Sequence, residues 1–215
     1  MWVVLSTTQS AILRNILDYN GRMQGNKFAL DANALNALAK WPNVPDCFGW
    51  LSLDPRGRWR IQDELITHPR TITFINHNYR QDELGRSYVQ NGPQLVFVDL
   101  EYTPWVYRLE HGDQLCAHTG KDGGVLNRLF IDETGSMIAD ATAGVGILHD
   151  SDLQTALARI WNTDGTRPGD EQLEIEFERL KKTGETALQF RWGTELLPIE
   201  LTDSHRLATQ FGYVP

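Results

Sequence analysis

The pattern of apolar and polar positions divides the chain into a helical beginning and a strand-rich remainder. Apolar residues recur every three or four positions within residues 11–17 and again within 34–39, which is the spacing of one face of a helix. Asn20-Gly21 ends the first predicted helix. Trp41-Pro42 ends the second, because proline disfavours helical geometry in the residue before it. The sequence therefore predicts a helical N-terminal segment over residues 1–45.

From Phe48 onward the pattern is typical of hairpins. Asp54-Pro55-Arg56-Gly57 carries proline and glycine at the positions that a type I turn prefers, between alternating segments at 49–53 and 58–61. Similar turns lie at 82–85, 110–113 and 132–135. Four such hairpins indicate a repeated building block, although any antiparallel protein accumulates turns that begin with Asp and end with Gly. We predict an α+β fold of two related antiparallel β-hairpin-rich units packed with a few helices, with the first unit at 46–108 and the second at 109–215.

Other segments give further predictions. Residues 94–100 are apolar on both faces, as in a central strand, whereas 65–79 is interrupted by Pro69 and is either extended or helical. The strict alternation of 173–177 predicts a strand that turns at 181–184 and returns through 187–192. Pro198 places a third strand, 196–201, at a sheet edge. Helices are expected from Asp150 or Ser151 through Trp161 and from Asp203 or Ser204 through Phe211.

Composition and charge narrow the function classes. The chain has 215 residues, 20 Lys and Arg against 28 Asp and Glu, and a net charge of −8, which disfavours a protein that tracks nucleic-acid phosphates. No apolar run approaches the roughly 20 residues that span a bilayer. Residues 1–5 are apolar but lack the basic region of a signal peptide and are followed at once by polar residues, so we expect no signal peptide. Two isolated cysteines, Cys47 and Cys116, suit a reducing compartment. We therefore expect a cytoplasmic protein without nucleic-acid or membrane partners.

One pair of carboxylates has a spacing that suits chemistry. Asp99 and Glu101 follow the most apolar segment at i and i+2, so both lie on one face of a strand. Acids beside a buried segment must be paired, solvated in a cleft or shifted in pKa. They could act as general acid and base or bind a hard cation. They could equally clamp an arginine, for which Arg80, Arg86 and Arg108 are candidates.

The remaining motifs are weaker. His111 and His118 flank one hairpin and could share a metal with Asp113 or Asp122, but turn or surface histidines have the same pattern. Residues 120–124 resemble a phosphate loop but lack the required GxxxxGK[ST] spacing, and GxSxG is absent. Cys116 reads more simply as a core thiol than as a nucleophile. We predict no catalytic residue, no metal site and no cofactor.

The residues around the hairpins resemble known families. The carrying motifs are Trp-Leu-Ser-Leu-Asp-x-Arg-Gly-x-Trp at 50–59, Phe-Ile-Asn-x-Asn-Tyr at 74–79, Asn-Gly-Pro-Gln at 91–94 and Val-Asp-Leu-Glu-Tyr-Thr-Pro-Trp-Val at 98–106. They are similar to uncharacterised proteobacterial proteins. A fainter similarity, over roughly residues 48–160, is to the family called domain of unknown function 1285. It is carried by Gly57-Arg58-Trp59, residues 82–88, and Val98-Asp99 with Pro104. The resemblance implies two α+β units with repeated β motifs, suggests ligand sensing or signalling, and implies no catalytic residues.

Together these features favour a non-enzymatic cytosolic module that binds a small ligand or a protein partner. The expected ligand-binding residues are polar or aromatic and belong to the first unit: Trp59, Arg80, Tyr88, Asn91, Gln94, Asp99 and Glu101. One alternative is a hydrolase or transferase that uses Asp99, Glu101 and His118, with or without a divalent cation. Another is a scaffold protein that forms a homodimer through its N-terminal helices.

Overall fold

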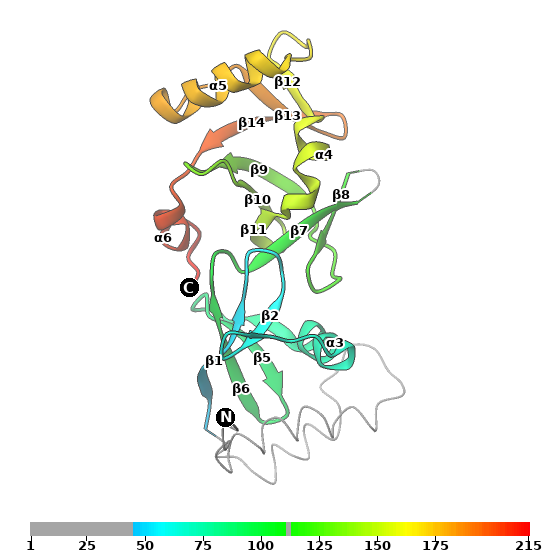
Figure 1. Ribbon diagram of the computed structural model, residues 1–215, viewed down its shortest axis with the longest axis vertical. Coiled ribbons are helices and arrows are strands. Elements are labelled where there is room, and N and C mark those ends of the chain that lie inside the picture. The colour runs from blue at the N-terminus through cyan, green and yellow to red at the C-terminus, as the bar shows by residue number, and fades with distance from the viewer. Residues whose placement is uncertain (1–44, 111–112) are drawn as a thin grey trace.

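The computed structural model describes residues 45–110 and 113–215 (Figure 1). The helices expected within 1–45, and His111, lie outside the described residues. The described chain forms two mixed sheets, of six and eight strands, together with short helices, so the predicted α+β class is confirmed. Figure 1 shows the two sheets one above the other along the long axis of the molecule, with the second sheet and the helix α5 at the top.

The six-stranded sheet is built from residues 47–100. Its elements are β1 (Cys47–Leu53), β2 (Trp59–Ile61), β3 (Glu64–Leu65), α3 (Pro69–Asn78), β4 (Tyr79–Gln81), β5 (Ser87–Asn91) and β6 (Gln94–Leu100), and the strand order is β3-β2-β1-β6-β5-β4. The apolar segment 94–100 is a central strand, as predicted. The ambiguous segment 65–79 contains a helix, α3. Pro69 begins this helix instead of interrupting it, because the first helical position needs no backbone N–H.

The eight-stranded sheet is built from the rest of the described chain. Its strands are β7 (Trp105–Glu110), β8 (Gln114–Ala117), β9 (Leu126–Ile131), β10 (Met137–Ala141), β11 (Gly144–Leu148), β12 (Ile160–Asn162), β13 (Leu188–Trp192) and β14 (Glu195–Leu201), in the order β12-β13-β14-β9-β10-β11-β7-β8. Its helices are η2 (Asp150–Asp152), α4 (Leu153–Leu157), α5 (Asp170–Thr183), η3 (Ser204–Arg206) and α6 (Leu207–Phe211). Neither sheet is purely antiparallel, since β1 pairs with β6, β7 with β11 and β9 with β14 in parallel.

The prediction of a strand at 173–177 was wrong, because these residues belong to the helix α5. In the helix, Ile175 lies on the opposite side from Leu173 and Phe177 and is 59% exposed, so the alternation is broken and a longer window is needed to recognise the helix. Leu173, Phe177 and Leu180 follow helical spacing, while Asp170 and Glu171 begin the helix and lysines end it, which suits the helix dipole. Gly184, with φ of 74°, caps the helix in the left-handed conformation and does not close a hairpin.

Two further predictions need correction in the second unit. The helix expected from residue 150 through Trp161 ends at Leu157, and Trp161 belongs to β12. The strand carrying Pro198 is not an edge strand, because β14 lies between β13 and β9. Residues 195–198 pair with β13, and 199–201 pair with β9. Pro198 therefore stands where the strand changes partners, which is a place that tolerates a missing N–H.

Three of the four predicted hairpin turns share one hydrogen-bond pattern. In each, Oδ1 of the first Asp accepts the backbone N–H of the residues two and four positions later, as seen at Asp54, Asp82 and Asp132. Oδ2 accepts the Nε–H of Arg58 at the first turn and of Arg86 at the second, both at 2.7 Å. At the third turn, Oδ2 accepts the Tyr102 hydroxyl instead. This common geometry agrees with two related units.

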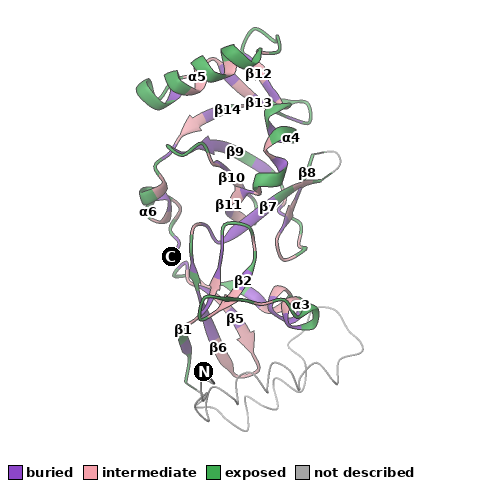
Figure 2. Cartoon of the chain, in the orientation of Figure 1, coloured by how far each residue is buried: buried purple, intermediate pink, exposed green. Residues whose placement is uncertain are grey.

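The hydrophobic core is continuous through both sheets. Figure 2 shows buried residues along the strands of each sheet and at the level where the sheets meet. At that junction Trp59 and Tyr79 of the first sheet meet Trp105 of the second, with ring centroids 5.2 Å apart for both Trp59–Tyr79 and Tyr79–Trp105. The Tyr79 hydroxyl donates to the Pro104 carbonyl at 2.7 Å. The two sheets are therefore joined by packed aromatic rings.

Candidate functional site

Three of the predicted ligand-binding residues share one face of the six-stranded sheet. In the register, Arg80 of β4 lies opposite Tyr88 of β5, and Tyr88 lies opposite Phe97 of β6. Asp99 lies two residues beyond Phe97 and therefore on the same face, because side chains alternate along a strand. Asp99 is opposite Ser52 in β1. We call the face that carries Arg80, Tyr88 and Asp99 the outer face.

The other four predicted residues are placed differently. Glu101 lies just beyond β6, with Oε1 3.7 Å from Nε of Arg60. Arg60 was not one of the three candidate arginines, of which Arg86 pairs with Asp82 and Arg108 with Asp152. Asn91 and Gln94 lie opposite each other beside the β5–β6 turn. Trp59 points to the other face, is 2% exposed and belongs to the core. The structure therefore separates Trp59 from the rest of the predicted set.

Aromatic side chains cover part of the outer face. The rings of Phe48 and Phe97 are stacked, with centroids 4.5 Å apart, and Tyr88 lies 6.1 Å from Phe97. The guanidinium carbon of Arg86 is 4.6 Å from the centroid of Phe97. Phe48 is 59% exposed. The outer face is thus an aromatic and charged surface in which the predicted Tyr88 takes part.

His118 occupies the aromatic junction between the sheets. Its ring lies 5.3 Å from Trp59, 5.4 Å from Tyr79 and 5.9 Å from Trp105, centroid to centroid. Nδ1 accepts the backbone N–H of Val106 at 3.3 Å, which leaves the proton on Nε2, and Nε2 is buried without a partner. Burial, together with the smaller effect of the positive charge of Lys121, lowers the pKa of His118 to about 3. His118 is therefore a neutral residue of the junction.

Lys121 lies beside the same junction and joins the two sheets. Its ammonium group donates to the Tyr79 carbonyl at 3.0 Å. Burial lowers the pKa of Lys121 to about 8, and the charge of Arg80 acts in the same direction. The charge of Lys121 therefore adds to burial in disfavouring a positive charge on His118.

The positions of these groups oppose the hydrolase alternative. That alternative needs Asp99, Glu101 and His118 in one pocket. His118 packs against Trp59 on the core face of the first sheet, whereas Asp99 is exposed on the outer face. Within residues 45–110 and 113–215, no group of three or more His, Cys, Asp or Glu side chains is arranged to hold a metal ion.

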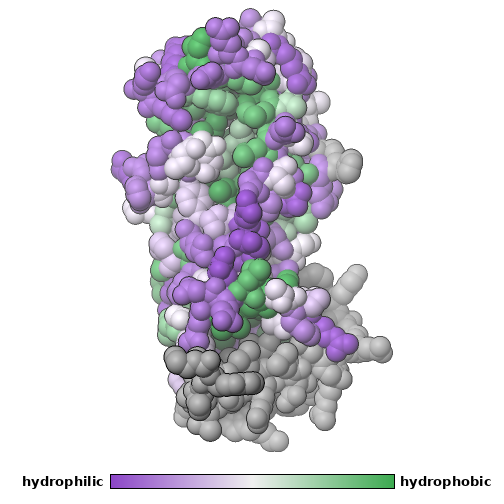
Figure 3. Space-filling view, viewed as in Figure 1, coloured by the Kyte–Doolittle hydropathy of each residue, from purple (hydrophilic) through white to green (hydrophobic). Residues whose placement is uncertain are grey.

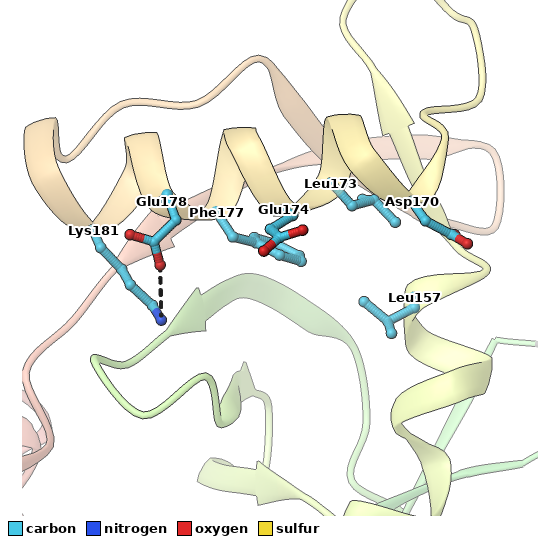
Figure 4. A pocket seen from close by; sticks show the side chains of 7 residues that line it. All are labelled: Leu157, Asp170, Leu173, Glu174, Phe177, Glu178 and Lys181. Atoms are coloured by element: carbon cyan, nitrogen blue, oxygen red, sulfur yellow. Dashed lines mark ion pairs between the residues drawn. The ribbon is translucent and has the colours of Figure 1, made fainter.

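A groove that the sequence did not indicate lies between α4 and α5. Its volume is about 400 Å³, and it is open to solvent. Figure 4 shows its seven lining side chains, with Leu157 pointing from α4 toward α5 and the others projecting from α5: Asp170, Leu173, Glu174, Phe177, Glu178 and Lys181. Sequence reasoning missed the groove because it assigned residues 173–177 to a strand. The acidic first turn, the basic last turn and Gly184 were the signals that could have revealed α5.

Two stripes of different chemistry run along the groove. Asp170, Glu174 and Glu178 are spaced four residues apart and form an acidic stripe, while Leu173 and Phe177 form an apolar stripe beside it. Glu178 Oε1 is 3.7 Å from Nζ of Lys181. Figure 3 shows hydrophobic surface between α5 and the sheet below it, bordered by polar surface on the helix. In α5 only Leu180 is fully buried.

Comparisons with known proteins place this α+β chain among proteins without an assigned activity. The family DUF2944, described as "Protein of unknown function (DUF2946)", matches residues 30–215, and the chain belongs to this family. The expected membership in an uncharacterised family is thereby confirmed. No curated protein matches the sequence. In the part of the chain that the structure describes, no helix is long and apolar enough to cross a membrane.

Two solved structures are similar to the chain, and both are DUF1285 family proteins, the second family that the sequence resembles. The protein from Silicibacter pomeroyi DSS-3 is 15% identical, with a TM-score of 0.48, and the match covers 86% of this chain and 94% of that one. The protein from Shewanella baltica OS155 is 10% identical, with a TM-score of 0.39, over 49% of this chain and 87% of that one.

Proposed function

We propose that this protein is a non-enzymatic binding module that holds a basic amphipathic helix of a partner protein in the α4–α5 groove. The observation that carries the proposal is the pair of stripes along α5. An apolar stripe beside an acidic stripe is the complement of a helix whose apolar face is bordered by Lys or Arg. A groove that is open to solvent suits a helix, which packs on it from outside, better than it suits an enclosed small molecule.

The dimensions agree with this mode of binding. α5 has 14 residues, so at about 1.5 Å per residue it is about 21 Å long and can accompany three to four turns of a partner helix. Leu157 is 37% exposed, and covering apolar side chains of this kind supplies the main attraction, at roughly 25 cal/mol for each Å² removed from water. Asp170 and Glu174 lack ion-pair partners among the described residues and are therefore available to a cationic partner.

The test is fluorescence anisotropy with the full chain and a labelled 16-residue amphipathic peptide made of Leu and Lys. A scrambled peptide of the same composition is the control, because it keeps the charge and loses the apolar face. We expect the amphipathic peptide to bind at least tenfold more tightly. Equal binding of the two peptides would reduce the interaction to general charge attraction and refute the proposal.

Matched variants locate the binding. Glu174→Gln should weaken the peptide's binding up to about fivefold, since an exposed ion pair contributes about 0.2–1 kcal/mol. Leu157→Ser should weaken it about tenfold through lost apolar contact. Glu171→Gln is the control, because Glu171 is on the same helix, carries the same charge and does not line the groove. If Glu171→Gln and Glu174→Gln lowered the peptide's affinity equally, the peptide would not be bound in the α4–α5 groove.

The cytosolic location belongs to this proposal as well. Cys47 and Cys116 are both free, Cys47 is buried, and burial raises the pKa of both thiols. Two free thiols support a reducing compartment.

A further inference from the structure

A second charged surface lies at the edge of the eight-stranded sheet formed by β12 and β13. Trp161 of the edge strand β12 is contacted by two guanidinium groups, from Arg191 of β13 and from Arg167 in the loop after β12. Their central carbons lie 3.5 Å and 4.7 Å from the centroid of the Trp161 ring. Such cation–π contacts hold the arginines in place on the sheet surface.

This surface is the solvent-facing side of the sheet. Trp161 lies opposite Gln189 in the register, and Arg191, two residues further along β13, therefore shares its face. Leu196 of β14 is opposite Arg191 and is 39% exposed. The residues that alternate with these, Ile160 and Phe190, are 1% and 0% exposed and belong to the core.

Both arginines lack a carboxylate partner. Among the described residues, Arg167 and Arg191 form no ion pair, whereas neighbouring Arg159 is 2.9 Å from Asp113. This is notable in a chain with a net charge of −8, where acidic side chains are plentiful. A cation–π contact does not use the N–H donors of a guanidinium, and those of Arg167 and Arg191 have no carboxylate to bind, so they are available to an oxyanion.

We infer that Trp161, Arg167 and Arg191 form a binding site for a small phosphate monoester. Two guanidinium charges match a phosphate dianion, and Arg binds phosphate through paired N–H donors. The Trp161 ring reduces the rotamer freedom that the arginines would otherwise lose on binding. The exposed Leu196 beside Arg191 offers an apolar contact for the organic group of the ester. This site lies on the exposed face of β12 and β13, and none of its three residues lines the α4–α5 groove.

The experiment is isothermal titration of the full chain with phenyl phosphate at pH 7.5, with phenylacetate as the carboxylate comparison. We expect phenyl phosphate to bind at least fivefold more tightly than phenylacetate. Its affinity should fall as the pH is lowered from 7.5 to 5.5, because the second phosphate pKa is about 6 and the monoanion replaces the dianion. Equal affinity for the two compounds would overturn the assignment to phosphate.

Variants separate the site from general charge attraction. Arg167→Gln and Arg191→Gln should each weaken phenyl phosphate binding at least fivefold, while Arg70→Gln, at an exposed arginine of α3, should leave it unchanged. Arg191→Lys keeps the charge and loses the planar group, so it should also weaken binding. Circular dichroism checks that each variant is folded. Because Arg167 lies in a loop, its substitution does not alter a strand of the sheet. Full binding by Arg167→Gln and Arg191→Gln, or an equal loss in Arg70→Gln, would overturn the inference.

Discussion

Acidification from neutral pH should destabilise this protein through the buried ring of His118. The pKa of His118 is lowered to about 3 in the folded protein, because its ring is buried among Trp59, Tyr79 and Trp105. In the unfolded chain the ring has its ordinary pKa of about 6.5. Between these values the unfolded chain binds a proton that the folded protein excludes. The stabilisation from the neutral ring is therefore complete above pH 6.5 and is lost as the pH falls toward 3.

The size of the effect follows from the width of this window. Each pH unit below 6.5 removes about 1.4 kcal/mol of the free energy of unfolding. Because half of the unfolded rings are already protonated at pH 6.5, the loss between pH 6.5 and 4.5 is about 2.3 kcal/mol, a large part of the roughly 5–15 kcal/mol of a typical domain. Asp54 and Asp152, whose pKa values are lowered by hydrogen bonds and arginine charges, lose their contributions only below about pH 4. The pH range from 6.5 to 4.5 thus separates the effect of His118 from the effects of Asp54 and Asp152.

The assay is urea unfolding of the full chain, followed by tryptophan fluorescence, at half-unit steps from pH 7 to 4.5. His118→Asn removes the titrating ring and keeps an oxygen that can accept the Val106 N–H. Its stability should be lower at pH 7 and should change little across the window. His77→Asn, at an exposed histidine of α3, should keep the wild-type slope. If His118→Asn and the wild type lose stability in parallel between pH 6.5 and 4.5, His118 is not the group that titrates.

Two other substitutions test the turns and the C-terminal contact. Asp54→Ala should lower the free energy of unfolding by about 2–3 kcal/mol, because it removes a buried carboxylate that accepts two backbone N–H groups and Arg58; a urea midpoint equal to the wild type would contradict this. Gly85→Ala places a Cβ 2.0 Å from the Gly212 carbonyl oxygen, where the C-terminal segment packs on the first sheet. It should lower the melting temperature more than Gly165→Ala, which has a similar φ of 81° and no atom within 4 Å and should cost about 1–2 kcal/mol from backbone strain alone. Equal melting temperatures would show that the C-terminal segment yields without cost.

The sequence by itself determined the local hairpins and the central strand. A turn such as Asp54–Gly57 is closed by hydrogen bonds within five residues, so its signal is complete in a short stretch. The same holds for the turns beginning at Asp82 and Asp132. Residues 94–100 are apolar on both faces, and only a central position buries both faces.

The tertiary structure decided what depends on partners far apart in the chain. No local sequence signal predicts that β1 pairs in parallel with β6, or that β14 pairs in parallel with β9. The paired residues are 47–49 positions apart in the first case and 70 positions apart in the second. The candidate site shows the same limit. Alternation within 173–177 is typical of a strand, although Leu173 and Phe177, four residues apart, also fit one face of a helix, and the packing of α5 beside Leu157 creates the groove. The neutral His118 likewise exists because rings from both sheets enclose it, and no spacing along the chain encodes that enclosure.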